Sequence, residues 1–190
     1  FHVTITGIGG HAAMPETAVD PVLCGAQIVT ALQSIASRSV DPFKEVVVSV
    51  TQFHAGTAFN IIPGTAVLNG TVRTFDDAVW KLVPERFEAI VRGVAQAMGC
   101  SVEIQYQRFN RVTCNNPEMA AIAHAAAAEV VGEGNVVTDL RTMGGEDFSW
   151  FLNRVPGCFI AVGSRTASRG LVYGHHHPRF DVDEQSMKIG

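Results

Sequence analysis

The sequence has 190 residues, of which 47% are hydrophobic and 17% are charged, and its formal net charge is −4. This composition excludes a disordered chain, which would combine low hydrophobicity with high net charge. It also gives no support for nonspecific binding to nucleic acid, which depends on surplus Lys and Arg. No apolar run approaches the roughly 18 residues that a membrane-spanning helix needs.

The four cysteines are scattered and form no C-x-x-C pair. The scatter argues against a zinc ribbon and against a dense disulfide framework. Free thiols in a reducing compartment are the simpler interpretation, so we expect a cytoplasmic protein.

The first half of the chain alternates between patterns typical of strands and of helices. Residues 1–6 alternate between apolar and polar side chains, which is the period of a half-buried strand. Asp20 and Pro21 suit a helix start, because Asp can cap a helix and Pro fits its first position. The β-branched run over 46–53 and the segment 66–75 predict two further strands.

A second helix and a fourth strand complete this half. Asp76 opens the helix, but Pro84 interrupts it, so we expect a short first turn and then a main helix from Pro84 to Gly99. Residues 101–106 again alternate as a strand. The order β-α-β-β-α-β is that of the ferredoxin-like fold, a four-stranded antiparallel sheet with two helices on one face. We therefore predict an α/β (α+β) protein.

The remaining residues carry fewer elements. Asn116 and Pro117 are expected to start an Ala-rich helix that ends near Val131, a short helix is expected after Asp147, and residues 158–162 have the pattern of a buried strand. So few elements do not make an independent core of usual size. We expect them to belong to a larger α/β domain that extends beyond this sequence.

Two motifs of the first half contain candidate functional residues. His11 follows two glycines, and small neighbours leave an imidazole free to act as acid, base or oxyanion donor. Asn60 and Arg73 lie near predicted strand ends, where the planar Arg fork suits a carboxylate. The alternatives are a solvated loop His, a turn Asn and a surface Arg.

Two motifs of the second half are further candidates. Imidazole is the commonest side-chain metal ligand, but neighbouring side chains of an extended segment point apart, so only one of His175–His177 is expected to bind a given ion. Gly144 and Gly145 precede a helix start and can present backbone N–H groups to an anion. The alternatives are an exposed turn and a plain loop.

Taken together, these motifs resemble a known family. The segments G-G-H-A-A-M-P, N-I-I-P-G, G-T-V-R-T-F, G-G-E-D-F and H-H-P-R-F-D-V-D-E are similar, in this order, to the dinuclear metallopeptidase family of aminoacylases and glutamate carboxypeptidases. The branch that it resembles most includes hippurate hydrolase, N-acetyl-diaminopimelate deacetylase and the auxin-conjugate hydrolases. The resemblance implies that residues 1–112 are a lid and dimerisation domain and that residues 113–190 are the C-terminal segment of the catalytic domain.

The resemblance also implies roles for six residues. His11 would be catalytic, reaching the partner's active site to stabilise the oxyanion. Asn60 and Arg73 would contact the substrate, with Arg73 binding its free carboxylate. The backbone at Gly144 and Gly145 would line the pocket, and His176, two residues before Pro178, matches the last metal ligand of the family.

The activity that the resemblance implies is hydrolysis of the amide bond of small N-acyl amino acids by a homodimer. Two divalent metal ions (Zn, Mn, Ni or Co) would activate the attacking water, and no nucleic acid or membrane would be a partner. The other metal ligands and the glutamate base of this family lie upstream of the lid and are absent here, so we expect an inactive fragment.

Two alternatives are a stand-alone dimerisation or interaction module without catalysis, which would pair through an edge strand, and an RNA-binding module of the same strand order. The segment 66–75 lacks the aromatic pair that RNA binding needs.

Overall fold

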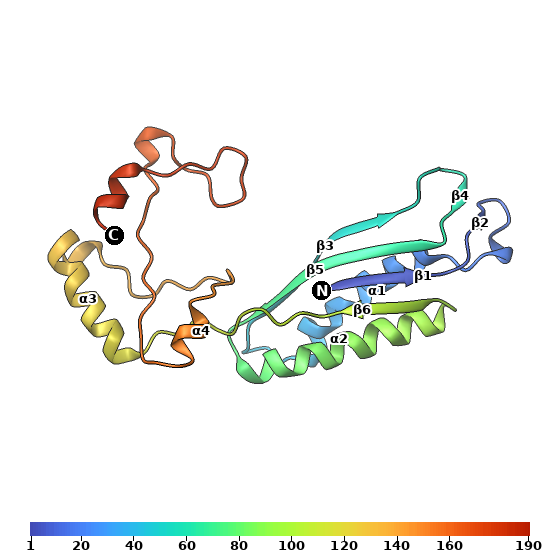
Figure 1. Ribbon diagram of the computed structural model, residues 1–190, viewed down its shortest axis with the longest axis horizontal. Coiled ribbons are helices and arrows are strands. Elements are labelled where there is room, and N and C mark those ends of the chain that lie inside the picture. Colours follow the sequence, from blue (N-terminus) through green and yellow to red (C-terminus); the bar gives the residue numbers. More distant parts are fainter. The chain divides into compact units, whose positions relative to one another are not determined.

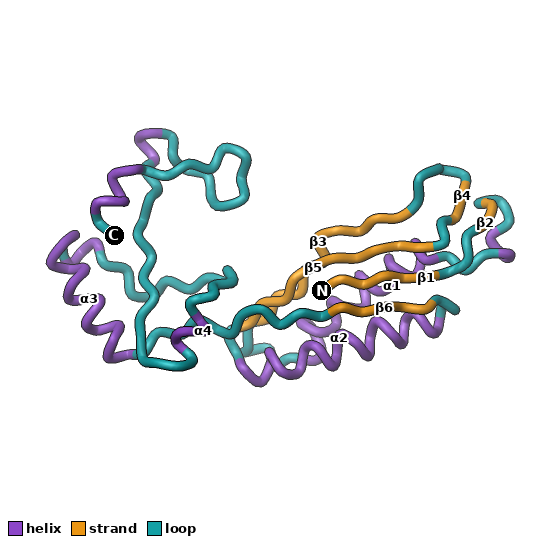
Figure 2. The backbone as a smooth tube through the Cα atoms, in the orientation of Figure 1, coloured by secondary structure: helices purple, strands orange, loops and turns teal.

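The computed structural model describes all 190 residues, and they form two compact units. The first unit contains residues 1–112 and 142–147, and the second contains residues 113–141 and 148–190. Figures 1 and 2 show the course of the chain and its helices and strands. No helix in either unit is long and apolar enough to cross a membrane.

The first unit has the predicted ferredoxin-like arrangement. Its elements are β1 (His2–Thr6), β2 (Gly10–His11), α1 (Pro21–Ser34), β3 (Val46–Ala55), β4 (Ile61–Ile62), β5 (Thr65–Thr74), α2 (Asp77–Ala97) and β6 (Ser101–Gln105). Four strands form an antiparallel sheet in the order β3-β5-β1-β6, and β2 pairs separately with β4. Helices α1 and α2 cover one face of the sheet (Figure 1). The predicted α/β fold and the order of its six main elements are confirmed, whereas the short strands β2 and β4 were not predicted.

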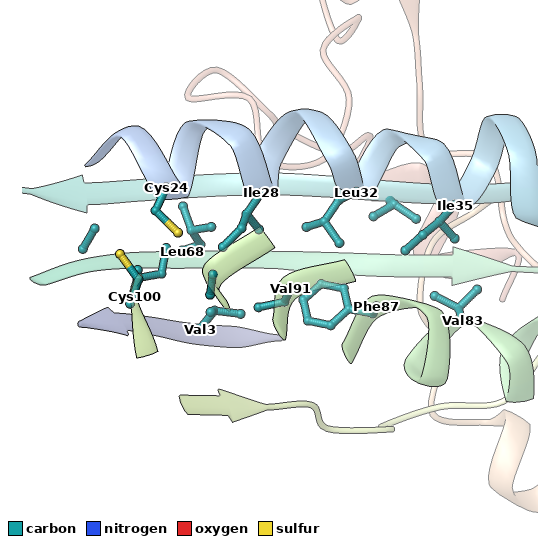
Figure 3. Close-up of a cluster of buried hydrophobic side chains, with 14 of the residues drawn as sticks. Val3, Cys24, Ile28, Leu32, Ile35, Leu68, Val83, Phe87, Val91 and Cys100 are labelled. Atoms are coloured by element: carbon teal, nitrogen blue, oxygen red, sulfur yellow. The ribbon is translucent and has the colours of Figure 1, made fainter. Parts of the chain in front are cut away.

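The core lies between the two helices and the sheet. Helix α1 and the turn that follows it contribute apolar residues at helical spacing, helix α2 contributes a second stripe, and strands β1 and β5 contribute residues of the sheet (Figure 3): Cys24, Ile28, Leu32, Ile35, Val83, Phe87, Val91, Val3 and Leu68. Ile5 of β1 belongs to the same core. Phe87 is fully buried, and its ring centroid lies 4.6 Å from that of Phe1 and 5.3 Å from that of Tyr106.

Helix α1 begins at the predicted cap. The Asp20 carboxylate accepts hydrogen bonds from the backbone N–H groups of Val22 and Leu23, at 2.8 and 3.2 Å. The helix approaches β3 closely at Gly25, where an added Cβ would lie 2.6 Å from the Phe53 ring. A single π-helical turn over Ile35–Ser39 follows the last residue of α1.

Helix α2 differs from the prediction. It runs without a break over Asp77–Ala97 with Pro84 inside it, so the expected short turn and separate main helix are wrong. The Asp76 side chain caps the first turn, and Val79 and Val83 are 3% and 1% exposed. Their burial holds the first two turns against the sheet, which offsets the roughly 3 kcal/mol that an internal proline costs.

The second unit has little regular structure. Helix α3 (Pro117–Val131) starts at the predicted cap, with Asn116 accepting from the next backbone N–H groups, and α4 (Ser149–Leu152) is a single turn. The predicted strand over residues 158–162 is wrong, since no strand forms there and Ile160 is 58% exposed. A strand needs a neighbour for its backbone groups, and the second unit contains no sheet.

Candidate functional site

His11 and Asn60 come together in a short two-stranded segment at one end of the first unit. We call this segment, residues 8–14 with 58–64, the tip. His11 of β2 pairs with Ile61 of β4, and the N–H of Ala12 donates to the backbone oxygen of Asn60 at 3.1 Å. Residues directly opposite each other in an antiparallel pair share one face, so the His11 and Ile61 side chains lie on the same side of the tip.

Close backbone contacts attach the tip to the sheet. The N–H of Gly7 donates to Gly64, and Ile8 and Val19 exchange two hydrogen bonds, all at 2.9 Å. A Cβ at Gly7 would lie only 2.1 Å from the Val19 carbonyl oxygen. The chain therefore needs glycine at position 7 to make this approach, and the approach fixes where the tip leaves β1.

The hydrogen bonding of His11 sets its tautomer. Its Nδ1 atom lies 3.0 Å from the N–H of Ala13 and accepts that hydrogen bond. In the neutral imidazole one ring nitrogen accepts and the other carries the proton. Nε2 therefore carries the proton, and the exposed His11 side chain presents a hydrogen-bond donor to its surroundings.

Arg73 lies at the opposite end of the sheet. Strand β5 starts at Thr65, which pairs with Thr6 beside the tip, and Arg73 is eight residues further along, about 26 Å away at the usual rise of a strand. The Arg73 Nη1 atom donates to the backbone oxygen of Val72 at 2.9 Å.

Gly145 passes directly beside the Arg73 side chain. A Cβ at Gly145 would be 3.3 Å from Nε and from Nη2 of the guanidinium. The N–H of Gly144 donates to the Thr142 hydroxyl at 3.2 Å, which shapes this loop. Three predicted residues, Arg73, Gly144 and Gly145, are thus close together, but they lie far from the tip.

His176 lies in the second unit, in the turn of three histidines. The His177 ring stacks on Tyr173 with centroids 4.1 Å apart, and the His175 ring packs edge-on against Phe180 at 4.8 Å. His176 is the one non-glycine residue with positive φ, at 67°. Such a conformation costs on the order of 1–3 kcal/mol and is concentrated at functional sites, which distinguishes His176 from its two neighbours.

The chain does not by itself fit the metal pair that the resemblance implies. No three His, Cys, Asp or Glu side chains gather in a way that could hold a metal ion. One imidazole supplies one ligand, whereas zinc usually takes three or four protein ligands. Two pockets of about 390 and 310 Å³ lie in the second unit, but none of the six predicted residues lines either of them.

Sequence reasoning did not single out two residues that the structure places beside His11. Gly7 sets the approach of the tip, and Ile61 faces His11 across the two strands. The available signals were the glycine-rich break after residue 6 and the apolar pair inside N-I-I-P-G. Neither signal reveals which residues pair, because pairing depends on the three-dimensional course of the chain.

Comparison with known proteins gives a consistent result. A family model described as a peptidase dimerisation domain matches residues 1–98. An N-acyl-L-amino acid amidohydrolase of Geobacillus stearothermophilus is 48% identical over 118 residues, which is 62% of this chain and 32% of that protein. An N-acetyldiaminopimelate deacetylase of Brevibacillus brevis is 34% identical over 189 residues, which is 100% of this chain and 49% of the relative.

The solved structures agree with the sequence relatives. A Bacillus subtilis protein described as a dinuclear metal binding peptidase has a TM-score of 0.63 and 26% identity, over 99% of this chain and 46% of that one. The chain spans about half the length of the full-coverage curated relatives that it matches.

Proposed function

The chain belongs to the peptidase dimerisation domain family, and from this we propose that the whole protein is a metal-dependent amidohydrolase that cleaves N-acyl amino acids. Relatives of similar sequence are named as amide-cleaving hydrolases, among them deacetylases and carboxypeptidases. In this proposal residues 1–112 are the lid and residues 113–190 return to the catalytic domain. The observation that carries the proposal is the division of the predicted residues between two opposite ends of one sheet.

In this proposal two copies of the chain associate through one edge of the sheet. Strand β3 is an edge of the sheet, is ten residues long and carries no charged side chain, whereas the other edge, β6, is five residues long and carries Glu103. Helix α1 packs beside β3, and Val22 and Leu23 on it are 38% and 51% exposed. A long, uncharged edge strand is prone to pair with another chain, so we assign self-association to the α1–β3 side.

The symmetry of such a dimer decides which residues of the two copies meet. If the β3 strands of two copies pair antiparallel about a two-fold axis, the strands of the partner run in the opposite direction. The tip of one copy then lies at the end of the dimer sheet where the partner carries its Arg73. Each site would combine His11 and Asn60 of one copy with Arg73 and Gly145 of the other.

The residues of this composite site have distinct chemical roles. The Nε2–H of His11 donates to the carbonyl oxygen of the scissile amide as negative charge develops on it, and a donor of this kind is usually worth about a hundred- to a thousandfold in rate. The Asn60 amide can both donate and accept, which suits the polar atoms of the substrate. The Arg73 guanidinium binds the free carboxylate in its planar fork, and Gly145 leaves room beside it.

His176 is proposed as one ligand of the metal pair of the whole protein. Its exposed, positive-φ position and the aromatic contacts of its two neighbours support this choice over His175 and His177. The remaining ligands would come from residues outside this chain.

Subunit complementation tests the composite site. His11→Ala and Arg73→Ala are made separately in the full-length protein, and each homodimer is expected to be nearly inactive towards N-acyl amino acids. In a heterodimer of the two variants, one site has lost both groups and the other has kept both. Random mixing should therefore restore about a quarter of the wild-type activity, from half of the dimers with one good site each. No recovery, in a mixture shown to contain heterodimers, would mean that both residues act within one copy.

The alternative is a module that only dimerises, and the uncharged α1–β3 side is what such a module would need. Metal content separates the two functions. The full-length hydrolase is expected to bind about two divalent ions per chain, and a pure interaction module is expected to bind none.

A further inference from the structure

The tip exposes apolar side chains that its own fold does not use. Phe59 is 102% exposed and Ile61 is 56% exposed, although Ile61 pairs with His11, and the residue between Phe59 and Ile61, Asn60, accepts a backbone hydrogen bond from Ala12. Exposed large apolar groups next to polar functional residues commonly mark a binding site.

Ile61 is the direct cross-strand neighbour of His11. Side chains paired in this way have their Cβ atoms about 5 Å apart on one face of the strands. Phe59 immediately precedes Asn60, whose backbone oxygen is bonded to the residue after His11. A molecule that contacts the Nε2–H of His11 therefore lies within reach of the Ile61 side chain.

We propose that Ile61, together with Phe59, forms an apolar wall against the acyl group of the substrate and makes the enzyme selective for long or aromatic acyl groups. The inference rests on the proposed function. In that function Arg73, from the other copy, holds the carboxylate of the amino acid, and His11 contacts the carbonyl oxygen. The part of the substrate furthest from the carboxylate is its acyl group, and it lies on the side from which the tip approaches.

The expected selectivity follows from burial of apolar surface. Each methylene removed from water against a protein surface contributes a factor of about four to binding. An N-hexanoyl amino acid has four more methylenes than its N-acetyl counterpart, and partial burial of them predicts a preference of about 10- to 100-fold in kcat/KM.

The test uses the full-length protein and one amino acid carrying N-acetyl, N-butanoyl, N-hexanoyl or N-benzoyl groups. The wild type should show kcat/KM rising with acyl length. In the double variant Ile61→Ala with Phe59→Ala, the ratio of hexanoyl to acetyl kcat/KM should fall by about tenfold or more. Ile8→Ala is the matched control, because Ile8 is 59% exposed but does not pair with His11, and it should leave the ratio unchanged.

Two results would overturn the inference while leaving the proposed function in place. One is an equal loss of kcat/KM across the whole acyl series in the double variant. The other is an unchanged ratio in a double variant that stays dimeric in sedimentation, which would show that the two side chains do not contact the acyl group. A wild type that hydrolyses none of the four substrates, with its metal ions bound, would instead overturn the proposed function and the inference with it.

Discussion

The change Gly7→Ala should separate the placement of His11 from its chemistry. Gly7 joins β1 to the tip, and an alanine Cβ there would lie 2.1 Å from the Val19 carbonyl oxygen. Real Cβ atoms essentially never come within 3.0 Å of such an atom, so Gly7 and Val19 would have to separate by about 0.9 Å. Backbone carbonyls do not rotate away as a flexible side chain does, so the movement passes to the tip.

The size of the effect follows from this displacement. Misplacing a catalytic group by about 1 Å can lower the rate by about a hundredfold. We therefore expect Gly7→Ala to lower kcat for N-acyl amino acids by about two orders of magnitude, with His11 itself unchanged. The assay is steady-state kinetics of the full-length protein together with thermal unfolding.

Gly93→Ala is the matched control. It is the same substitution in helix α2, at a position where an added Cβ meets nothing within 4 Å, and alanine is favoured over glycine inside a helix by up to about 1 kcal/mol. This control should keep its activity and gain slightly in stability. If Gly7→Ala also kept the wild-type kcat, the close approach of Gly7 to Val19 would not be what positions His11.

Two further predictions concern the core of the first unit. Phe87→Ala should destabilise the chain by about 3–5 kcal/mol in urea denaturation. The control Phe43→Ala changes a side chain that is 94% exposed, and it should alter the free energy of unfolding by less than about 0.5 kcal/mol. Equal effects of the two substitutions would place Phe87 outside the core. Burial is the main cause that raises the pKa of Cys24 to about 12, and the neighbouring Cys100 thiol is the next. Because iodoacetamide reacts with the thiolate, at pH 8 it should label the exposed Cys114 before the buried Cys24 or Cys100. Peptide mass spectrometry would show the order, all four thiols should react in denaturant, and early labelling of Cys24 in the native chain would contradict its burial.

The ferredoxin-like fold could be predicted because each of its elements carries a local signal. Strands β1 and β6 show alternation, α1 begins at an Asp-Pro pair, and each element has one apolar face that another element covers. Local signals of this kind do not depend on contacts between distant residues. For this reason the sequence predicts the order of the six main elements, whereas the two-residue strands β2 and β4, which carry no such signal, are not predicted.

The errors arose where a local rule competes with distant contacts. Pro84 normally ends or kinks a helix, but the burial of Val79 and Val83 keeps α2 continuous across it. The apolar run at residues 158–162 has the composition of a strand, but a strand also needs a neighbour, and none is present in the second unit. Composition indicates that a segment can form a strand, and only the surrounding sheet decides whether it does.

The arrangement of the candidate site also depends on contacts between distant residues, which local motifs do not encode. The motifs indicated which residue types matter, but their spacing along the sequence did not reveal that His11 and Arg73 lie at opposite ends of one sheet. Strand β5 spans that separation as a continuous ten-residue strand, which pairs with β3 along most of its length and with β1 over Thr65–Asn69, so bending cannot bring the two residues of one copy together. If both contact one small amide substrate, they must come from different copies. Provided that both residues act in the reaction, the geometry of the first unit therefore requires two copies of the chain.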